Sequence, residues 1–311
     1  MEEQDITTEG EGGVWRQAAL ALWSRPMIRA CLIIMLLFSL LAGYGEAVYQ
    51  YYRHTDQTPT YQQLNLRERY QPPGFVRFYS TRSAADLFRH PLGTDNLGRD
   101  VALRIVQGAR IAFQVGVVTS LIAIPLGVLL GCLGGYFGGR TDALVVWLYS
   151  TVASMPGLLF ILAISVVVGK GLTGVYLGIG LTTWVGVCRL IRGEVIKHRD
   201  LPYVQAARVM GHGPFYILFR HILPNIAHVI IIVFSLRFPA AISTEVFISF
   251  LGLGAQNEPS WGIMINNARL RLWQGMWWEL TFVTLALFLL VLSFNLAGDA
   301  LRDAFDPRLR K

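Results

Sequence analysis

Hydrophobic residues are gathered into long stretches along the chain, and most charged residues lie between these stretches. Six stretches together contain 132 residues but only three charges, which are Glu46, Arg237 and Glu245. Each stretch is close to the roughly 20 apolar residues that an α-helix needs to cross a bilayer core. The pattern predicts an all-α integral membrane protein with six transmembrane helices, at residues 30–48, 111–137, 144–168, 172–188, 226–250 and 280–298.

The polar segments between these stretches divide the chain into regions. Residues 1–29 predict an acidic tail followed by a short Trp-containing interfacial helix, and residues 30–48 are the first span. Residues 49–110 are too polar to cross a membrane, so we expect an ordered loop outside it. The remaining five spans form a core at residues 111–298, and residues 299–311 form a C-terminal tail.

The distribution of Lys and Arg predicts how the helices are oriented. If both termini are cytoplasmic, the cytoplasmic segments hold 14 of these residues and the short external loops hold 3. Cytoplasmic connections carry the excess of Lys and Arg in membrane proteins, whereas long loops translocate largely regardless of charge. Both termini and the polar segment 189–225 are therefore expected in the cytoplasm, and the loop 49–110 outside.

Composition excludes an ordinary soluble enzyme, a disordered chain and a secreted disulfide scaffold. Hydrophobic residues make up 53% of the chain and charged residues 15%, against roughly 25% charged residues in a typical soluble domain. The net charge of +7 comes mostly from residues that flank apolar stretches, so it indicates topology and not a nucleic-acid partner. The cysteines Cys31, Cys132 and Cys188 lie in apolar stretches without metal-ligand spacing, so no metal site is predicted.

The segment 189–225 is patterned like a short helix that lies on the membrane surface. Asp200 is expected to cap the N-terminus of this helix, and Gly211 to end it with left-handed backbone. A second amphipathic piece then leads to Pro224 and back into the bilayer. Between the two ends, apolar and small residues recur at helical spacing, namely Tyr203, Ala206, Ala207 and Met210.

This segment resembles the coupling loop of ABC importer permeases. The signature of that loop is Glu-Ala-Ala, three residues, Gly, nine residues and Ile-x-Leu-Pro. Gln205, Ala206 and Ala207 are followed at the same spacing by Gly211 and by residues 221–224, which read His-Ile-Leu-Pro. Two residues depart from the signature, because Gln205 replaces Glu and His replaces the first Ile. Gln205 keeps hydrogen-bonding capacity but lacks the charge for a salt bridge.

Three further blocks narrow the resemblance to the dipeptide, oligopeptide and nickel importer branch, and to its C-type subunit. Residues 90–100, which read HPLGTDNLGRD, are similar to the block before the second span of that family. Residues 250–262 contain FLGLGAQ and PSWG, and residues 294–307 contain FNLAGD, LRD and DP. These two are similar to the blocks after the fifth span and at the C-terminus. The matches run from about residue 90 to residue 310.

The resemblance implies a type I permease fold and a set of partners. These are a second homologous permease, two cytoplasmic ATPase subunits and an extracytoplasmic substrate-binding protein, in the inner membrane of a prokaryote. ATP and Mg²⁺ are expected on the ATPase subunits, with no cofactor and no catalytic residue on this chain. Short peptides are the expected substrate, with nickel or another small solute as the alternative. The residues implied in ATPase coupling are Tyr203, Gln205, Ala206, Ala207, Gly211 and Pro224.

Arg237 and Glu245 are the only Asp, Glu, Lys or Arg residues within the last four expected spans. Such groups are costly in lipid and usually face a protein interior or an aqueous cavity. One interpretation is a buried ion pair or an arginine that reaches the interface. The other places Glu245 on the translocation path, where it meets the amino group of a peptide. Trp-rich residues 261–278 are expected to pack against the protein or to anchor it in the membrane at the external interface. Docking of the binding protein is the alternative for this segment and for the loop 49–110.

Two other classes of function would show different sequence features. A membrane-embedded enzyme would carry a motif such as H-E-x-x-H or G-x-S-x-G, and neither is present. A phosphate-binding loop needs G-x-x-x-x-G-K-[ST], and residues 169–171 provide only Gly-Lys-Gly. A secondary transporter or channel would distribute polar residues over several broken helices and would work without an ATPase.

Overall fold

The structure is a computed structural model of the chain, and it describes residue 23 and residues 25–81, 84–254 and 258–305. The expected acidic tail lies outside these residues, as do most of the expected interfacial helix and the end of the C-terminal tail. In the described ranges every regular element is a helix, and the sole β-type pairing there is an isolated bridge between Thr94 and Asp100.

Five helices in the described part of the chain are long and apolar enough to cross a bilayer without a break. Each contains or largely overlaps one of the apolar stretches of the sequence. A sixth span is present if two shorter helices, α6 and α7, are counted together. The five are α2 (Pro26–Thr55), α5 (Val101–Phe137), α8 (Leu172–Arg199), α12 (Ala227–Phe250) and α14 (Trp278–Phe305).

The expected continuous span at 144–168 is broken. Its place is taken by α6 (Gly139–Ala153) and α7 (Gly157–Val168), which meet at an angle of 85°. Pro156 occupies the N-cap of α7, and the ring of a proline disfavours helical backbone at the residue before it. The apolar pattern alone did not show the break, because hydrophobic residues continue through both halves.

Several spans extend beyond their apolar stretches. α5 begins at Val101 because the Asp100 carboxylate caps it, accepting the backbone N–H groups of Ala102 at 2.8 Å and Leu103 at 3.2 Å. α8 continues to Arg199, and its last turn carries three basic residues that suit the negative end of the helix dipole. The N-terminus of α5 and the C-terminus of α8 therefore extend beyond the apolar stretches of the sequence.

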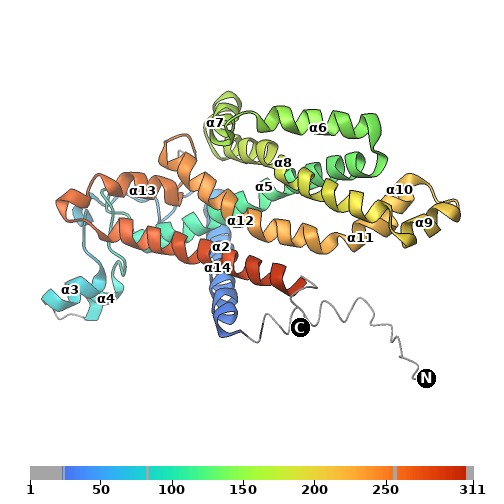
Figure 1. The fold of residues 1–311 in the computed structure, drawn as a ribbon. Coiled ribbons are helices and arrows are strands. Elements are labelled where there is room, and N and C mark those ends of the chain that lie inside the picture. Colours follow the sequence, from blue (N-terminus) through green and yellow to red (C-terminus); the bar gives the residue numbers. More distant parts are fainter. Residues whose placement is uncertain (1–22, 24, 82–83, 255–257, 306–311) are drawn as a thin grey trace, which may run out of the picture.

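α5 is the central helix of the bundle. It packs along most of the length of α8 and also contacts α2, α12 and α14. In Figure 1, α6 and α7 lie over α8, and α2 crosses α5 and α14 at a steep angle. The aromatic core between α12 and α14 includes Phe238 stacked on Phe294, with ring centroids 4.4 Å apart.

Glycines on α5 bring it close to α8. Gly127, Gly131 and Gly135 all face α8, and a Cβ atom at Gly131 would lie 2.8 Å from the Cys188 carbonyl oxygen. Small residues at this four-residue spacing allow two helices to approach closely. It makes α5 and α8 a tightly packed pair.

Short elements gather at the two ends of the bundle (Figure 1). We call the end that carries α9 to α11 the coupling end, and the opposite end the outer end. The outer end holds η1 (Leu66–Glu68), α3 (Gly74–Thr81), α4 (Ala84–Phe88), α13 (Trp261–Arg269) and η3 (Leu272–Gln274). The coupling end holds α9 (Pro202–Val209), α10 (Pro214–Ile217), the π-helical turn η2 (Leu218–Ile222) and α11 (Leu223–Asn225).

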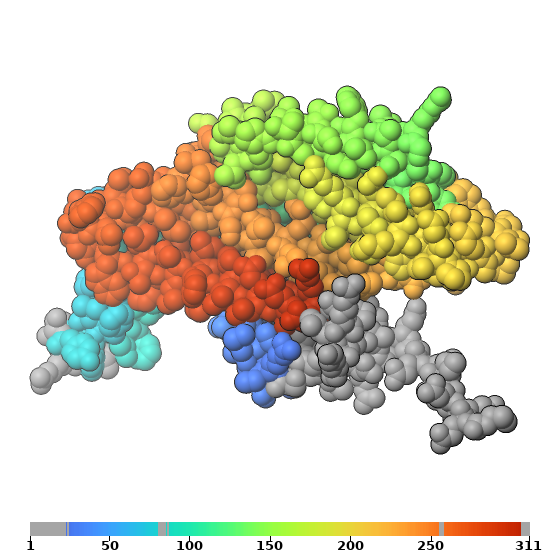
Figure 2. All heavy atoms as spheres, in the orientation of Figure 1, coloured from blue at the N-terminus to red at the C-terminus, as the bar shows by residue number. Residues whose placement is uncertain are grey.

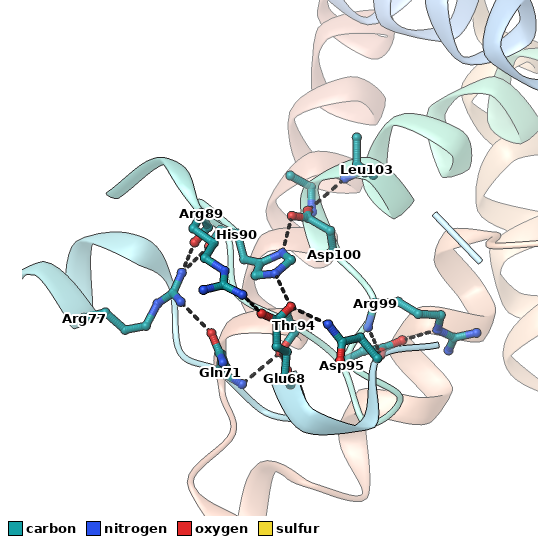
Figure 3. A network of polar contacts seen from close by, with 12 residues as sticks. Glu68, Gln71, Arg77, Arg89, His90, Thr94, Asp95, Arg99, Asp100 and Leu103 are labelled. Carbon is teal, nitrogen blue, oxygen red and sulfur yellow. Dashed lines mark hydrogen bonds and ion pairs between the residues drawn. The ribbon is translucent and has the colours of Figure 1, made fainter. Parts of the chain in front are cut away.

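A polar network attaches the long loop to the outer end (Figure 3). His90 lies between two carboxylates, with Nδ1 2.8 Å from Asp100 and Nε2 3.0 Å from Glu68. Because Asp100 also caps α5, the loop and the helix share this residue. The indole N–H of Trp278 at the start of α14 donates to the Thr94 carbonyl at 3.0 Å. The HPLGTDNLGRD block thus joins the loop to two spans.

The Trp-rich outer segment is divided between the core and the surface. Trp261 is buried and its indole N–H donates to the Ile105 carbonyl of α5 at 3.1 Å. Trp273, in η3, is 93% exposed. Of the two roles expected for this segment, Trp261 has the packing role, and membrane anchoring stays a prediction for the exposed Trp273.

Candidate functional site

The coupling helix α9 forms where the sequence predicted it, but its N-terminus is built differently. Leu201 occupies the N-cap and makes no side-chain capping bond. Asp200, the predicted cap, is the C-cap of α8 instead, because α8 runs on to Arg199 and only Asp200 and Leu201 separate the two helices. Pro202 suits the first turn of α9, since it has no N–H that needs a cap.

The C-terminus of α9 follows the predicted design. Gly211 has a φ of +82°, the left-handed conformation that favours glycine. The Gly211 N–H donates to the Arg208 carbonyl at 2.9 Å, and the His212 N–H donates to the Ala207 carbonyl at 3.2 Å. These two bonds make a Schellman motif, which ends the helix and turns the chain toward α10.

One face of α9 packs onto the chain itself. Val204 and Ala207 are completely buried, in a hydrophobic cluster with Ile191 of α8 and Ile222 of η2. The side chain of Ala207 has no exposed surface in this structure, so its contact with a partner stays a prediction. Helical periodicity explains this burial, because Val204 and Ala207 are three residues apart and share the inward face.

Tyr203 joins α9 to the end of α8. Its ring packs against the same cluster, and its hydroxyl lies 2.8 Å from His198 Nδ1. Burial raises the pKa of Tyr203 above its ordinary value, so the hydroxyl stays protonated. Tyr203 is half-buried and ties the helix to its support, which leaves only part of its surface for a partner.

The opposite face of α9 and the adjoining α10 present an exposed apolar surface. Gln205 and Ala206 lie on it, and Val209 is 89% exposed. An apolar patch of this kind marks an interaction surface. Figure 2 shows α9 and α10 projecting at the end of the bundle. We call this surface the docking face, and it consists of Gln205, Ala206, Val209, Met210, Phe215, Tyr216 and Phe219.

Four of these residues, Val209, Phe215, Tyr216 and Phe219, were not singled out from the sequence. Val209, Phe215 and Phe219 are apolar, and a pattern that counts hydrophobic positions assigns them to a buried face. Their exposure depends on how α9 and α10 turn relative to α8, which is a matter of tertiary packing. Pro224, by contrast, lies outside the docking face, at the start of α11.

Arginines of α8 and α9 connect these helices to their neighbours. The Arg192 guanidinium of α8 makes a two-point ion pair with Asp142 of α6, at 2.5 and 2.6 Å. Arg199 donates to the Gly135 carbonyl of α5 at 3.1 Å, and Arg208 of α9 lies over the ring of Tyr136 at 5.4 Å. These contacts connect α8 to α6 and α5, and α9 to α5.

The two charges within α12 do not pair with each other. Eight residues of helix separate Arg237 and Glu245 by about 12 Å along the axis. The Glu245 carboxylate is 1% exposed, accepts the Ser249 hydroxyl at 2.6 Å and is also hydrogen-bonded by Ser260. In this conformation Glu245 is enclosed by its own chain, and its position on a translocation path stays a prediction. Arg237 is half-buried and makes no hydrogen bond or ion pair within the described ranges.

Arg110 of α5 forms a polar cluster nearer the outer end that sequence reasoning missed. Its side chain is 2% exposed, pairs with Glu46 of α2 at 3.5 Å and with Glu258, and lies over the ring of Tyr49 at 3.9 Å. Gln114 donates to the same Glu46 carboxylate at 2.8 Å. The cluster joins α2, α5 and the segment before α13. In the described residues no three His, Cys, Asp or Glu side chains are grouped to hold a metal.

Comparisons with known proteins agree with this geometry. The dipeptide transport system permease protein DppC of Bacillus subtilis is 40% identical over 223 residues, 71% of this chain and 70% of that protein. The oligopeptide permease protein OppC of the same organism is 33% identical over 299 residues, 96% and 91% of the two chains. The glutathione permease protein GsiD of Pectobacterium atrosepticum is 40% identical over 222 residues, 71% and 73% of the two chains.

The fold is also found among solved structures. A chain of an inward-facing MetNI methionine ABC transporter superposes with a TM-score of 0.52 at 16% identity. The similarity covers 66% of this chain and 97% of that one, and it supports the type I permease fold. Residues 123–311 match the family described as the binding-protein-dependent transport system inner membrane component. With five or six candidate membrane spans in the described residues, the chain belongs to this family of permeases.

Proposed function

We propose that the chain is a permease subunit of an ATP-driven importer of short peptides, and that an ATPase subunit binds its docking face. The observation that carries the proposal is the arrangement of α9, which buries Val204 and Ala207 inward and exposes Val209 and Met210 outward. A helix held this firmly transmits a push or pull to the bundle, whereas a slack loop would absorb it. The coupling end is then cytoplasmic, as are both termini, in the inner membrane of a prokaryote.

The proposed assembly contains more than this chain. A second homologous permease completes the translocation path, and two ATPase subunits carry ATP and Mg²⁺. A substrate-binding protein delivers the solute at the outer end. Large apolar side chains of α2 and α6, including Leu36, Leu40 and Trp147, are exposed in the isolated chain. Lipid and the second permease would cover them, because a bilayer or a protein interface removes this surface from water.

Peptides are the favoured substrate because of the relatives. The names of the similar proteins specify dipeptides, oligopeptides and glutathione, at 33–40% identity. Nickel or another small solute is the alternative for the same architecture. A secondary transporter is less favoured, since the docking face would then have no partner.

Reconstitution in proteoliposomes tests the proposal. The chain is assembled with its neighbouring permease, ATPase and binding-protein subunits, and uptake of a labelled dipeptide is compared with uptake of glutathione and nickel. We expect dipeptide uptake that requires ATP and the binding protein. Uptake that proceeds without the ATPase would contradict the coupling, and uptake of nickel alone would contradict the peptide assignment.

A further inference from the structure

Arg237 is a positive charge placed near the middle of a membrane-spanning helix. It is the eleventh residue of α12, which has 24 residues, and its side chain is half-buried. Residues before and after it on the same stripe are apolar. Val233 belongs to a hydrophobic cluster with Val187 and Ile191 of α8, and Ala241 belongs to another with Ile179 of α8. The guanidinium therefore lies between two apolar contacts of α12 with α8.

The surface of α8 beside Arg237 is open. Gly186 is exposed, and a Cβ atom built on it would meet only the Arg237 guanidinium, at 3.8 Å. One turn away on α8, the Thr182 hydroxyl oxygen is shielded from solvent but has no hydrogen-bond partner. The two helices thus leave a polar position with unused hydrogen-bonding capacity, and glycine leaves space there for another group.

Arg237 has no acidic partner among the described residues. A charged side chain in the centre of a bilayer is costly unless it is paired or faces water. No carboxylate of the described residues lies within ion-pair distance of Arg237, and Glu245 is satisfied by two serines. By contrast, Arg110 and Arg192 each have acidic partners within the chain. The counter-charge of Arg237 must therefore come from outside the described residues.

We propose that Arg237, beside the open surface at Gly186, is a recognition position on the translocation path for the carboxylate of the transported solute. The inference rests on the proposed function, because peptides carry a free carboxylate. A single guanidinium with one unpaired neighbouring hydroxyl binds an anion only weakly. Weak binding suits a path, since a solute must leave each position that it enters.

Cysteine substitution tests whether Arg237 faces water. In the assembled complex, Arg237→Cys is treated with two membrane-impermeant thiol reagents, one that adds a trimethylammonioethyl cation and one that adds a sulfonatoethyl anion. Arg140→Cys, which is exposed at the coupling end, is the reactive control, and Leu40→Cys on the exposed apolar face of α2 is the unreactive control. The three native cysteines are buried, and the parental complex gives their background.

We expect both reagents to modify the thiol introduced by Arg237→Cys, and only the cation to restore peptide uptake. Translocating peptide should slow the modification, because it occupies the same space. An introduced thiol that does not react would overturn the inference by placing the residue in lipid or in a closed interface. Equal recovery with both reagents would overturn it as well, since the positive charge would then be unnecessary.

Two further variants separate recognition from assembly. Arg237→Gln is expected to copurify with the second permease in normal yield but to lower dipeptide uptake by about tenfold, while Arg237→Lys stays within about threefold of the parental rate. Arg140→Gln removes one charge elsewhere and should leave uptake unchanged. Failure of Arg237→Gln to assemble would overturn the inference in favour of a fixed ion pair with the second permease. If the parental complex shows no uptake, the proposed function fails instead.

Discussion

The Arg192 guanidinium of α8 donates two hydrogen bonds to the Asp142 carboxylate of α6, with Nε 2.5 Å from Oδ1 and Nη2 2.6 Å from Oδ2. The pair attaches α6, the first half of the broken span, to α8, which packs along α5. Planar two-point contacts of this kind fix orientation as well as distance, and lysine cannot reproduce them. We infer that the pair keeps α6 in step with α8 when the docking face moves.

Replacing Arg192 by Lys should therefore uncouple the two helices without unfolding the chain. We expect ATP hydrolysis to continue while peptide uptake falls by about tenfold, because a single-point contact leaves α6 free to rotate. The measurement is the ratio of peptide transported to ATP hydrolysed in proteoliposomes. Glu194→Gln, which disrupts a pair with Lys197 on the same helix at 2.7 Å, is the control and should keep the parental ratio. A normal ratio in Arg192→Lys would show that the second contact is dispensable.

Replacing Gly131 by Ala tests the tight packing of α5 on α8. The added methyl would lie 2.8 Å from the Cys188 carbonyl, so the helices must separate locally. Overpacking of this kind typically costs about 1–3 kcal/mol. The melting temperature of the purified complex should fall accordingly. Gly43→Ala on α2 is the matched control, because nothing lies within 4 Å of its added Cβ atom. Equal melting temperatures for both variants would contradict the packing argument.

Ala206 and Ala207 are neighbours in sequence but should respond differently to a charge. Ala206→Glu places the carboxylate on the exposed docking face, so the permease should fold normally and lose its ATPase subunits. Ala207→Glu places it in a fully buried position, where an unpaired charge also disrupts the fold of the loop. Copurification of the ATPase reports docking, and limited proteolysis at residues 200–225 reports the fold. Proteolysis that increases equally in both variants would contradict the assigned faces.

Replacing Tyr203 by Phe removes the hydroxyl near His198 and keeps the packed ring. Loss of one hydrogen bond costs about 0.5–1.5 kcal/mol near neutral pH. Because burial raises the pKa of Tyr203, the folded loop favours the protonated phenol. The contribution of this phenol to the stability of the folded loop is fully present below the ordinary pKa of 10. It is lost as the pH rises through the raised pKa of the folded state. Loop protection measured by hydrogen exchange should fall at alkaline pH in the parental chain, and this component of the fall should be absent in Tyr203→Phe. The same additional alkaline loss in both proteins would assign it to another group.

Much of the functional loop was predictable because its signals are local. The proline at the start of α9, the glycine at its end and the spacing between them act within a few residues of backbone. The positive φ of Gly211 follows from the same local requirement. The cap was mispredicted because α8 continues to Arg199 along α5, so that Asp200 is the C-cap of α8 and not the N-cap of α9.

The order of residues alone establishes the membrane class, the apolar stretches, the family resemblance and the position of the coupling helix. Hydrophobic length and short-range turn chemistry are properties of consecutive residues, so no folding is needed to see them. Which residues face outward depends on the packed helices. Packing buried Ala207, enclosed Glu245 between two serines and left Arg237 beside an open glycine. These outcomes follow from which helices lie side by side, because burial and pairing are relationships between residues distant in sequence.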